Sequence, residues 1–386
     1  MVEHKKKYAG IRNCSASKFI AIRVGQGDAF FTEKGDMAFL VDGGRSISSF
    51  PCQFLRATGR NHIDVLTCTH NDSDHGNGVL GFLLAGLKAE EVWLPASWLD
   101  RLEDIILRPE GFLKELVEDI EELPEDQVMG LSQLGDKYAT ETRNKDSRVV
   151  EVGSQELYRA FEQVSDMEWF STLSLEYGFP PTNKRKMFVE AVSGAKLIRE
   201  IALAAYLSGS LIKWFDFIGD KNLAQAAGGI RDVLIPVNAV EVAQIRRPKR
   251  GALKYIALTR SNKQSLVFTS PKTKDDPGVL FTADSNLRFY QQISWHEHMI
   301  ITAPHHGSEA NQHAYSRFKN ETGGMDVSWV RSDGRFSKRP GKSFLTINNR
   351  KFCTLCRNSR LPKQDVRLVM VTHSWHPLHT RKCICQ

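Results

Sequence analysis

Short apolar runs that end abruptly in polar residues recur along this chain. Residues 63–67 are followed by THNDSDHGNG at 69–78, residues 279–283 by DSN, and residues 299–303 by PHHGSEAN. Apolar runs of this length that are rich in β-branched residues are typical of buried strands. The pattern therefore predicts three buried strands, each of which ends at a polar loop.

Other segments predict a hairpin and a block of helices. The runs 23–31 and 37–44 flank a turn at 33–36, as in a β-hairpin, and further strands are predicted at 233–237 and 255–258. Between Pro95 and about Gly229 apolar residues recur with a helical period. Within this block, residues 197–218 are the most apolar, but four charged residues interrupt them, so we predict a buried amphipathic helix and no membrane span.

The loop after the first predicted strand holds four metal-competent side chains within six residues: His70, Asp72, Asp74 and His75. Asn, Asp, Ser and Gly are common in ordinary turns, but a turn needs no pair of histidines. In an extended segment His70 and Asp72 would point the same way, and Asp74 and His75 could face a neighbouring ion. This spacing predicts a two-metal site on a loop at the carboxyl end of a strand.

The other two predicted strands end in residues that could complete this site. Asp284 would supply a carboxylate able to bridge two cations, and either His305 or His306 an imidazole ligand, with His306 favoured. Asp42, at the end of the hairpin, could accept a hydrogen bond from a ligand imidazole. Asp28 is interpreted as part of the hairpin loop.

Taken in order, the motifs VGQGDA, LVDGG, THNDSDHGNG, TRSNKQSLVF, LFTADSN and APHHGS resemble the metallo-β-lactamase superfamily, and within it the hydrolase domain of ComEC-type DNA-uptake proteins. The resemblance spans both ends of residues 19–310 and omits the middle third of the chain. It implies an α/β fold, a four-layer αββα sandwich with the metal cleft at one edge of two packed mixed sheets, here with a helical insertion.

The chain departs from the superfamily's HxHxDH motif in two ways. Asp72 replaces the second histidine, as in the ComEC-like branch, and no histidine lies between His75 and Asp284, where the superfamily commonly supplies another ligand to the first metal site. That site is therefore expected to be incomplete unless a carboxylate or water fills it. Oxygen-rich ligation suits Mn²⁺ as well as Zn²⁺.

The expected site combines metal ligands with groups that act on the substrate. A metal-activated water would attack, and the histidine of the 305–306 pair that is not a ligand would protonate the leaving oxygen, with Ser308 as a nearby donor. The expected metal ligands are His70, Asp72, Asp74, His75, Asp284 and His306. The expected catalytic residues are Asp74, His305 and His306, supported by Asp42 and Ser308.

Charge is distributed unevenly along the chain. The net charge is +7, yet residues 100–126 contain 11 acidic and 3 basic side chains. Basic clusters lie at 5–7, 184–186, 246–250 and 335–342. A basic surface attracts nucleic acid, although such clusters often serve only solubility. The N-terminus lacks the apolar run of a signal peptide, so a cytoplasmic protein that does not contact a membrane is expected.

Four of the seven cysteines lie near the C-terminus, with Cys353 and Cys356 in a CxxC pair and Cys383 and Cys385 in a CxC pair. In a protein kept in a reducing compartment, this spacing favours a structural Zn²⁺ over a disulfide, and reduced thiols are the alternative. His373, His376 and His379 could replace one cysteine or lie on the surface. The remaining cysteines, Cys14, Cys52 and Cys68, are expected in the core.

These expectations divide the chain into three parts. Residues 1–95 and 230–350 would form the metallo-β-lactamase-like domain, 96–229 a mainly helical insertion that could dock a protein partner, and 351–386 a Cys/His-rich tail. The expected function is that of a metal-dependent phosphodiesterase or nuclease. Two alternatives stay open: a hydrolase of a small ester, lactone or cyclic nucleotide, and a non-catalytic metal-binding subunit of a multi-protein complex, for instance one of phage defence.

Overall fold

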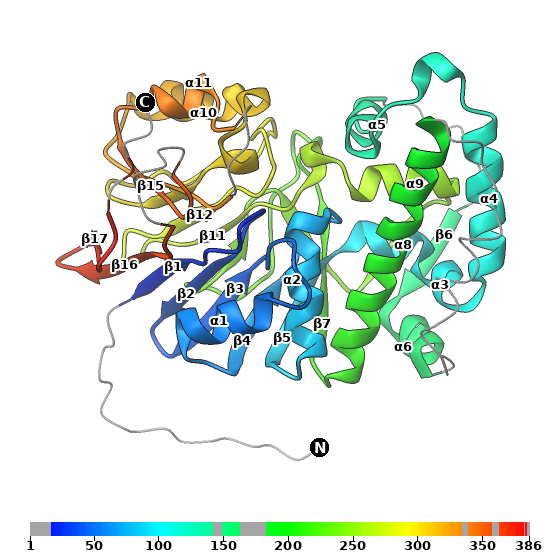
Figure 1. Ribbon diagram of the computed structural model, residues 1–386, viewed down its shortest axis with the longest axis horizontal. Helices are drawn as coiled ribbons and strands as arrows, with labels where there is room; N and C mark the ends of the chain where they lie inside the picture. The colour runs from blue at the N-terminus through cyan, green and yellow to red at the C-terminus, as the bar shows by residue number, and fades with distance from the viewer. Residues whose placement is uncertain are drawn as a thin grey trace.

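Two β-sheets form the centre of the protein, and helices lie outside them (Figure 1). The computed structural model describes residues 17–141, 149–162, 183–333, 339–356, 363–381 and 383. Within these residues the larger sheet has nine strands in the order β17-β16-β1-β2-β3-β4-β5-β7-β9. Their bounds are β1 Lys18–Ala21, β2 Phe30–Lys34, β3 Met37–Val41, β4 His62–Thr67, β5 Lys88–Pro95, β7 Leu211–Phe217, β9 Ala239–Val242, β16 Val366–Val371 and β17 Ser374–Pro377.

The larger sheet is mixed. Strands β3, β4, β5 and β7 are parallel neighbours, whereas the pairs on either side of them are antiparallel. The predicted hairpin is confirmed as β2 and β3, which pair from Phe30 opposite Val41 to Lys34 opposite Met37. The first predicted buried strand is confirmed as β4. The loop that carries the four metal-competent residues therefore leaves the carboxyl end of a central parallel strand.

The smaller sheet has six strands in the order β15-β14-β13-β12-β11-β8. Strands β12 to β15 are parallel neighbours, and β12 and β13 are the other two predicted buried strands. A separate two-stranded sheet pairs β6 with β10. The bounds are β6 Val149–Gly153, β8 Ile235–Pro236, β10 Gln244–Pro248, β11 Phe268–Ser270, β12 Val279–Phe281, β13 Ile300–Thr302, β14 Ser328–Arg331 and β15 Arg350–Cys353.

Three apolar clusters define four layers. One lies between the sheets and joins residues such as Phe39 and Trp93 of the larger sheet to Phe281 and Ile300 of the smaller. A second packs the outer face of the larger sheet on helices α1 to α6, α8 and α9, and a third packs the outer face of the smaller sheet on α10 and α11. The helices are α1 Phe50–Thr58, α2 Ser73–Leu84, α3 Leu99–Leu107, α4 Pro109–Glu121, α5 Leu131–Tyr138, α6 Ser154–Glu162, α8 Asn183–Leu207, α9 Ala252–Thr259, α10 Gln312–Thr322 and α11 Lys342–Leu345. The fold is thus an α/β sandwich.

The strand pairing crosses two boundaries of the predicted division into three parts. Strand β7 falls within the predicted insertion, but it pairs with β5 in the larger sheet. Strands β16 and β17 fall within the predicted tail, but β16 pairs with β1 in the same sheet. The described residues of region 96–229 are mainly helical, and helices α3 to α6 lie in the right half of Figure 1. The insertion therefore interrupts the connection from β5 to β7.

Two predicted elements differ from the structure. Residues 255–258 were predicted as a strand and lie in helix α9, where Tyr255 and Ile256 are buried between α4 and α8. The apolar stretch 197–218 was predicted as one helix, but α8 ends at Leu207 and a turn through Gly209 leads into β7. A short apolar run fits either a helix or a strand, and tertiary packing decides between them.

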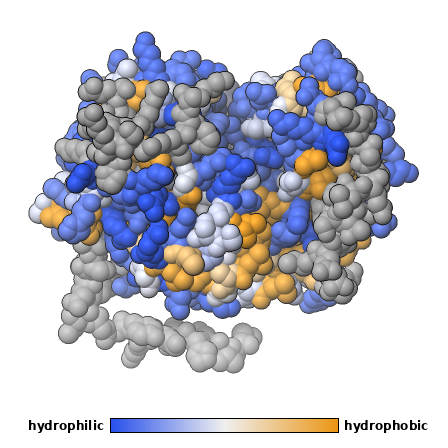
Figure 2. Space-filling model, viewed as in Figure 1, coloured by the Kyte–Doolittle hydropathy of each residue, from blue (hydrophilic) through white to orange (hydrophobic). Residues whose placement is uncertain are grey.

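The surface in this orientation is largely polar (Figure 2). Hydrophobic residues gather in the lower middle part, where Figure 1 shows α1, α2 and α8. Exposed apolar side chains on these helices include Leu55, Leu84 and Val189. None of the described helices is both long and apolar enough to cross a membrane.

Candidate metal centre

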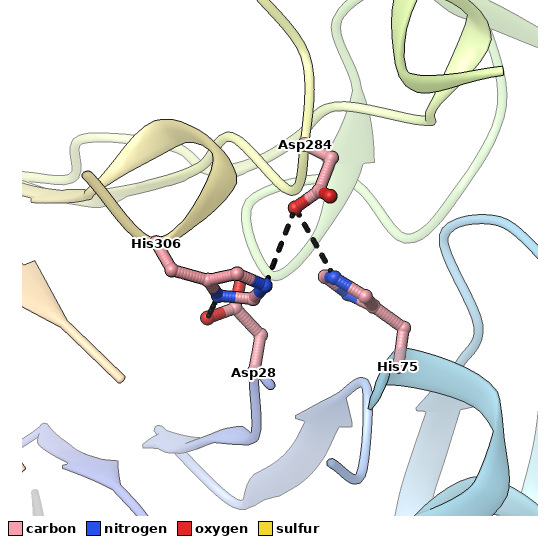
Figure 3. Close-up of side chains that lie close together, drawn as sticks. All are labelled: Asp28, His75, Asp284 and His306. Carbon is pink, nitrogen blue, oxygen red and sulfur yellow. Dashed lines mark hydrogen bonds and ion pairs between the residues drawn. The ribbon is translucent and has the colours of Figure 1, made fainter. Parts of the chain in front are cut away.

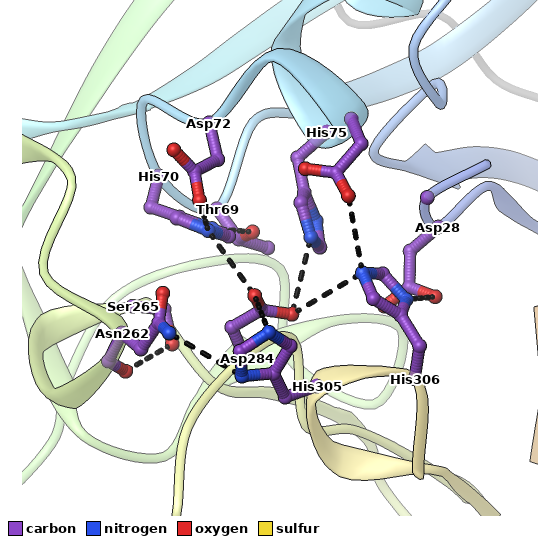
Figure 4. Close-up of polar contacts among 12 residues, drawn as sticks. Asp28, Thr69, His70, Asp72, His75, Asn262, Ser265, Asp284, His305 and His306 are labelled. Atoms are coloured by element: carbon purple, nitrogen blue, oxygen red, sulfur yellow. Dashed lines mark hydrogen bonds and ion pairs between the residues drawn. The ribbon is translucent and has the colours of Figure 1, made fainter. Parts of the chain in front are cut away.

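The three polar strand ends predicted from the sequence meet at one place. The loop after β4 and the N-terminus of α2 come from the larger sheet, and the loops after β12 and β13 come from the smaller one (Figure 4). The loop before β2 closes against α2, because Asp28 N donates to the Asp74 carbonyl over 3.2 Å. Gly27 allows this approach, since a Cβ there would lie 1.6 Å from the same oxygen. The two sheets therefore present their side chains to a common cleft.

Asp284 lies at the centre of this cleft, and each of its carboxylate oxygens faces a different group of side chains (Figure 4). Around Oδ1 are His75 Nε2 at 3.1 Å and His306 Nε2 at 3.7 Å, and Asp74 Oδ2 is 3.5 Å from that His306 nitrogen. Around Oδ2 are His305 Nε2 at 3.5 Å and His70 Nε2 at 3.8 Å, and Asp72 Oδ2 is 3.8 Å from that His70 nitrogen. Asp284 therefore joins two groups of donor atoms.

The spacing and the bonding of these atoms fit a metal ion. Nitrogen and oxygen ligands about 2.0–2.2 Å from one cation lie about 3.0–3.6 Å apart. The Nε2 atoms of His70, His75 and His306 and Oδ1 of Asp284 are buried and make no hydrogen bond of regular geometry. Because buried polar atoms are normally satisfied, the convergence of four unsatisfied ones needs an explanation. The buried cluster of Asp28, His75, Asp284 and His306 can hold a metal ion, and so can the group of His70, Asp72 and Asp284.

Two aspartates orient histidines from behind. Asp42 Oδ2 lies 2.8 Å from His75 Nδ1, the contact expected from the sequence, and also accepts from the Thr69 hydroxyl. Asp28 Oδ1 lies 3.0 Å from His306 Nδ1 (Figure 3). A hydrogen bond at Nδ1 fixes the ring and directs Nε2 into the cleft, as in carboxylate–histidine–metal arrangements. Asp28, interpreted from the sequence as loop structure, thus lies in the centre itself.

The backbone of the centre is strained. Asp42, Ala283, His305 and His306 have φ values of 60°, 47°, 45° and 54°, in the left-handed region that non-glycine residues rarely adopt. Each such residue costs about 1–3 kcal/mol and persists where the surrounding structure enforces it. Strain of this kind concentrates at functional sites, which agrees with the side-chain geometry.

The charges in the cleft are strongly coupled. Burial tends to lower the pKa of His75, but the carboxylates of Asp284 and Asp42 outweigh it and raise that pKa well above the usual value. Burial also tends to lower the pKa of His306, but the carboxylates of Asp28 and Asp284 outweigh it and raise that pKa well above the usual value. Burial and the neighbouring His75 lower the pKa of His70. Although burial opposes it, the surrounding histidines hold the pKa of Asp284 well below its usual range. The carboxylates therefore favour positive charge in the cleft, which a bound cation could supply.

Two contacts in the centre could not be foreseen from the individual residues. Arg260, at the end of α9, donates Nε to Asp72 Oδ1 over 2.8 Å, and Asn262 lies 3.3 Å from His305 Nδ1. Both residues belong to the TRSNKQS segment. The sequence marks this segment only as one of the motifs that resemble the metallo-β-lactamase superfamily. The Ser308 hydroxyl, predicted as a nearby donor, accepts from Ala310 N and caps the short 3₁₀ helix that follows; this contact leaves its own proton free to donate.

The described cysteines differ in how deeply they are buried. Cys353 ends β15, and it and Cys356 are buried in the cluster beneath the smaller sheet. Cys383 Sγ lies 3.3 Å from Cys356 Sγ. Cys385, like Cys14, lies outside the described residues. Cys68 is buried as predicted, but Cys52 is exposed because it faces outward on α1, so its predicted core position is wrong.

The basic cluster at 246–250 is mostly paired within the protein. Arg247 contacts Asp100 and Asp216, and Lys249 contacts Asp104, so part of the acidic segment neutralises it. Arg246 is exposed. Residues 5–7 and 334–338 lie outside the described residues.

Comparison with known proteins adds no family to this description. No protein-family model matches the chain, and no curated protein matches it. The function is therefore inferred from the fold and from the geometry of the cleft.

Proposed function

We propose that the protein is a metal-dependent hydrolase of the metallo-β-lactamase superfamily that cleaves phosphodiester bonds, above all those of nucleic acid. The observation that carries this proposal is the convergence on Asp284 of buried imidazole nitrogens that lack regular hydrogen bonds. Support for the superfamily comes from the four-layer arrangement and from the position of the cleft at the strand ends of both sheets.

The two groups of donors would hold two cations. Asp74, His75, His306 and Asp284 Oδ1 would hold one, and His70, Asp72 and Asp284 Oδ2 the other. His305, on the side of Asp284 Oδ2, would complete the second set and replace the histidine that the sequence lacks between His75 and Asp284. The mixed nitrogen and oxygen donors suit Zn²⁺ or Mn²⁺. When bound, such cations lower the pKa of a bound water to about 7 and neutralise charge at a phosphoryl centre.

The protein's own groups prepare this chemistry. Asp28 and Asp42 hold His306 and His75 so that their Nε2 atoms face the cleft. Arg260 pairs with one oxygen of Asp72 and leaves the other facing His70. His305 is 26% exposed, whereas His70, His75 and His306 are buried. Substrate would therefore approach the cleft from the His305 side.

Two exposed basic side chains, Lys221 and Arg246, line a pocket of about 310 Å³ beside the cleft. Arg247 and Arg250 also line it but are paired with Asp216 and Asp100, and the pocket includes Asp220. It shares Ser97, Phe217 and Gln264 with a small cavity that reaches His70. Arg246 and Lys221 are exposed there and could contact a neighbouring phosphate of a polynucleotide. The pocket thus supports nucleic acid over an uncharged ester or lactone.

The test is hydrolysis by the purified chain with Mn²⁺ or Zn²⁺. Substrates are single- and double-stranded DNA, RNA, bis(p-nitrophenyl) phosphate, a cyclic nucleotide, a carboxylic ester and a lactone. We expect cleavage of the phosphodiesters, and its loss in the Asp74→Ala, His75→Ala double variant. His62→Ala is the matched control, because His62 is exposed and pairs only with Glu90 at 2.7 Å among the described residues.

Three results would overturn the proposal or part of it. Cleavage that survives in the double variant would mean that another site, or a contaminant, is responsible. Hydrolysis of the ester or lactone alone would replace the phosphodiester substrate. Bound metal at the cleft without hydrolysis of any substrate would favour the non-catalytic subunit. His305→Ala adds detail: loss of one metal per chain supports its assignment as ligand, and retention of both contradicts it.

A further inference from the structure

We propose that Cys353, Cys356 and Cys383 hold a structural zinc ion that fastens the C-terminal tail to the end of β15. This site is separate from the cleft, and it does not depend on the proposed hydrolase function. Its residues belong to the smaller sheet and to the last described part of the chain. It is the one cysteine motif of the sequence that the function does not use.

The backbone brings Cys383 next to Cys356, just beyond the end of β15. Cys353 is the last residue of β15, and a bend through Thr354 and Leu355 leads to Cys356. Thr354 N donates to the Arg331 carbonyl over 3.0 Å, which holds this bend against β14. Cys383 N donates to the Lys351 carbonyl over 2.8 Å, so the tail runs back along β15. The sulfur atoms of Cys356 and Cys383, 27 positions apart in the sequence, are thereby brought into contact.

The distance between these sulfurs distinguishes the possible bonds. Cys356 Sγ and Cys383 Sγ are 3.3 Å apart. A disulfide would require about 2.05 Å. Two thiolates bound to one tetrahedral zinc at about 2.3 Å lie about 3.8 Å apart. The observed separation is far beyond a covalent bond and needs only a small adjustment to accommodate a shared ion.

Burial and spacing support zinc over unmodified thiols. Cys353 and Cys356 are 2% and 4% exposed, and Cys383 packs against the same apolar cluster. A CxxC turn at a strand end together with a second, distant pair is the usual arrangement of a structural zinc site. Cys385, two residues beyond Cys383, is the fourth ligand predicted from the sequence and lies outside the described residues. The described histidines of the tail are exposed: His373 and His376 on the β16–β17 hairpin, and His379 just after it.

The first experiment counts zinc. Full-length protein carrying Asp284→Asn, which removes the carboxylate shared by the two cleft sites, is dialysed and its zinc is measured by mass spectrometry. We expect one zinc per chain. Adding Cys356→Ser should reduce the content to less than about a tenth of that, whereas adding Cys52→Ser, the exposed cysteine of α1, should leave it unchanged.

A second experiment uses the unmodified chain and so does not depend on how the variant folds. Titration of the thiols with an organomercurial should release zinc in proportion, as detected with a metallochromic dye, and Co²⁺ exchanged into the site should show thiolate-to-cobalt charge-transfer absorption. Zinc that stays in Cys356→Ser, or an intact mass lower by two hydrogens that reveals a disulfide between Cys356 and Cys383, would overturn the proposal.

Discussion

Two clusters of charged side chains among the described residues differ in how their atoms are arranged. In the Arg101 cluster, which comprises Arg101, Asp104, Glu115 and Lys249, donors face acceptors. Arg101 donates to Asp104 over 2.6 Å, to both oxygens of Glu115 and to the Arg250 carbonyl. In the metal centre, by contrast, nitrogens and carboxylate oxygens suited to a cation face one another around Asp284.

The difference separates a structural cluster from a functional one. In the Arg101 cluster opposite charges meet, so the Asp104 and Glu115 contacts outweigh burial and raise the pKa of Arg101. No further ion is needed for its charge balance. In the metal centre the carboxylates of Asp28, Asp42 and Asp284 face histidines instead of Arg or Lys, and they raise the pKa of His75 and His306. Buried charge alone is therefore a poor guide to function, whereas unsatisfied ligand atoms with the spacing of a coordination sphere are a good one.

The largest expected effect comes from Asp284→Asn. It removes the carboxylate that joins the two donor groups, so we expect hydrolysis of bis(p-nitrophenyl) phosphate to fall by about 10³-fold or more. Metal-dependent stabilisation should also disappear. A ligand at 100 times its Kd stabilises the folded state by about 2.7 kcal/mol, so added Mn²⁺ should raise the Tm of the unmodified chain and leave that of the variant unchanged.

Asp275→Asn is the matched control for this substitution, because Asp275 is an exposed aspartate in the same part of the chain. It should retain both the activity and the response to Mn²⁺. A variant Asp284→Asn that still gains stability from Mn²⁺ would show that the cation binds elsewhere, and the distinction between the two clusters would fail.

The next effect concerns folding instead of catalysis. Arg101→Met leaves Glu115 without its bidentate partner and removes one of the cations around Asp104, and Arg101 is only 2% exposed. Because Glu115 is 38% exposed and water can solvate it after the change, we expect a loss of about 1–3 kcal/mol, which urea unfolding would measure. Arg108→Met removes another cation from Asp104, but Arg108 is 68% exposed, so the loss should stay below about 1 kcal/mol. If both variants lose the same amount, or if Arg101→Met abolishes the response to Mn²⁺, the Arg101 cluster is not purely structural.

The sequence predicts the metal centre better than it predicts the surrounding elements. Strands that end in His and Asp can be recognised in the sequence because such residues are unusual at these positions. The structure brings His75, Asp284 and His306 together. By contrast, Tyr255 and Ile256 lie in an apolar segment short enough for a strand or a helix, and their burial against α4 and α8 decides for the helix.

Side chains that orient or pair with a distant side chain are the hardest to predict from the sequence. Asp28 follows two glycines in a segment that is typical of an ordinary loop. Only the fold brings its carboxylate into contact with the ring of His306, 278 positions away. The pairing of Arg247 with Asp100 likewise joins an acidic segment and a basic cluster that lie far apart in the sequence. Local patterns reveal a ligand at a strand end, but they do not reveal which distant side chain orients it.

The smallest expected effect is a pH dependence confined to the Arg101 cluster. Burial would raise the pKa of Asp104, but Lys249 and Arg101 outweigh it and lower that pKa below its usual value of 3.8. The unfolded chain then binds more protons than the folded one at acidic pH, so stability from ionised Asp104 is present above pH 3.8 and is lost as the pH falls through the folded pKa. Asp104→Asn lacks this contribution of about 1–2 kcal/mol at neutral pH. Urea unfolding from pH 7 to pH 3 should therefore show the difference between the two proteins shrinking towards the acidic end, and a difference that grows instead would show that Asp104 is destabilised by its surroundings.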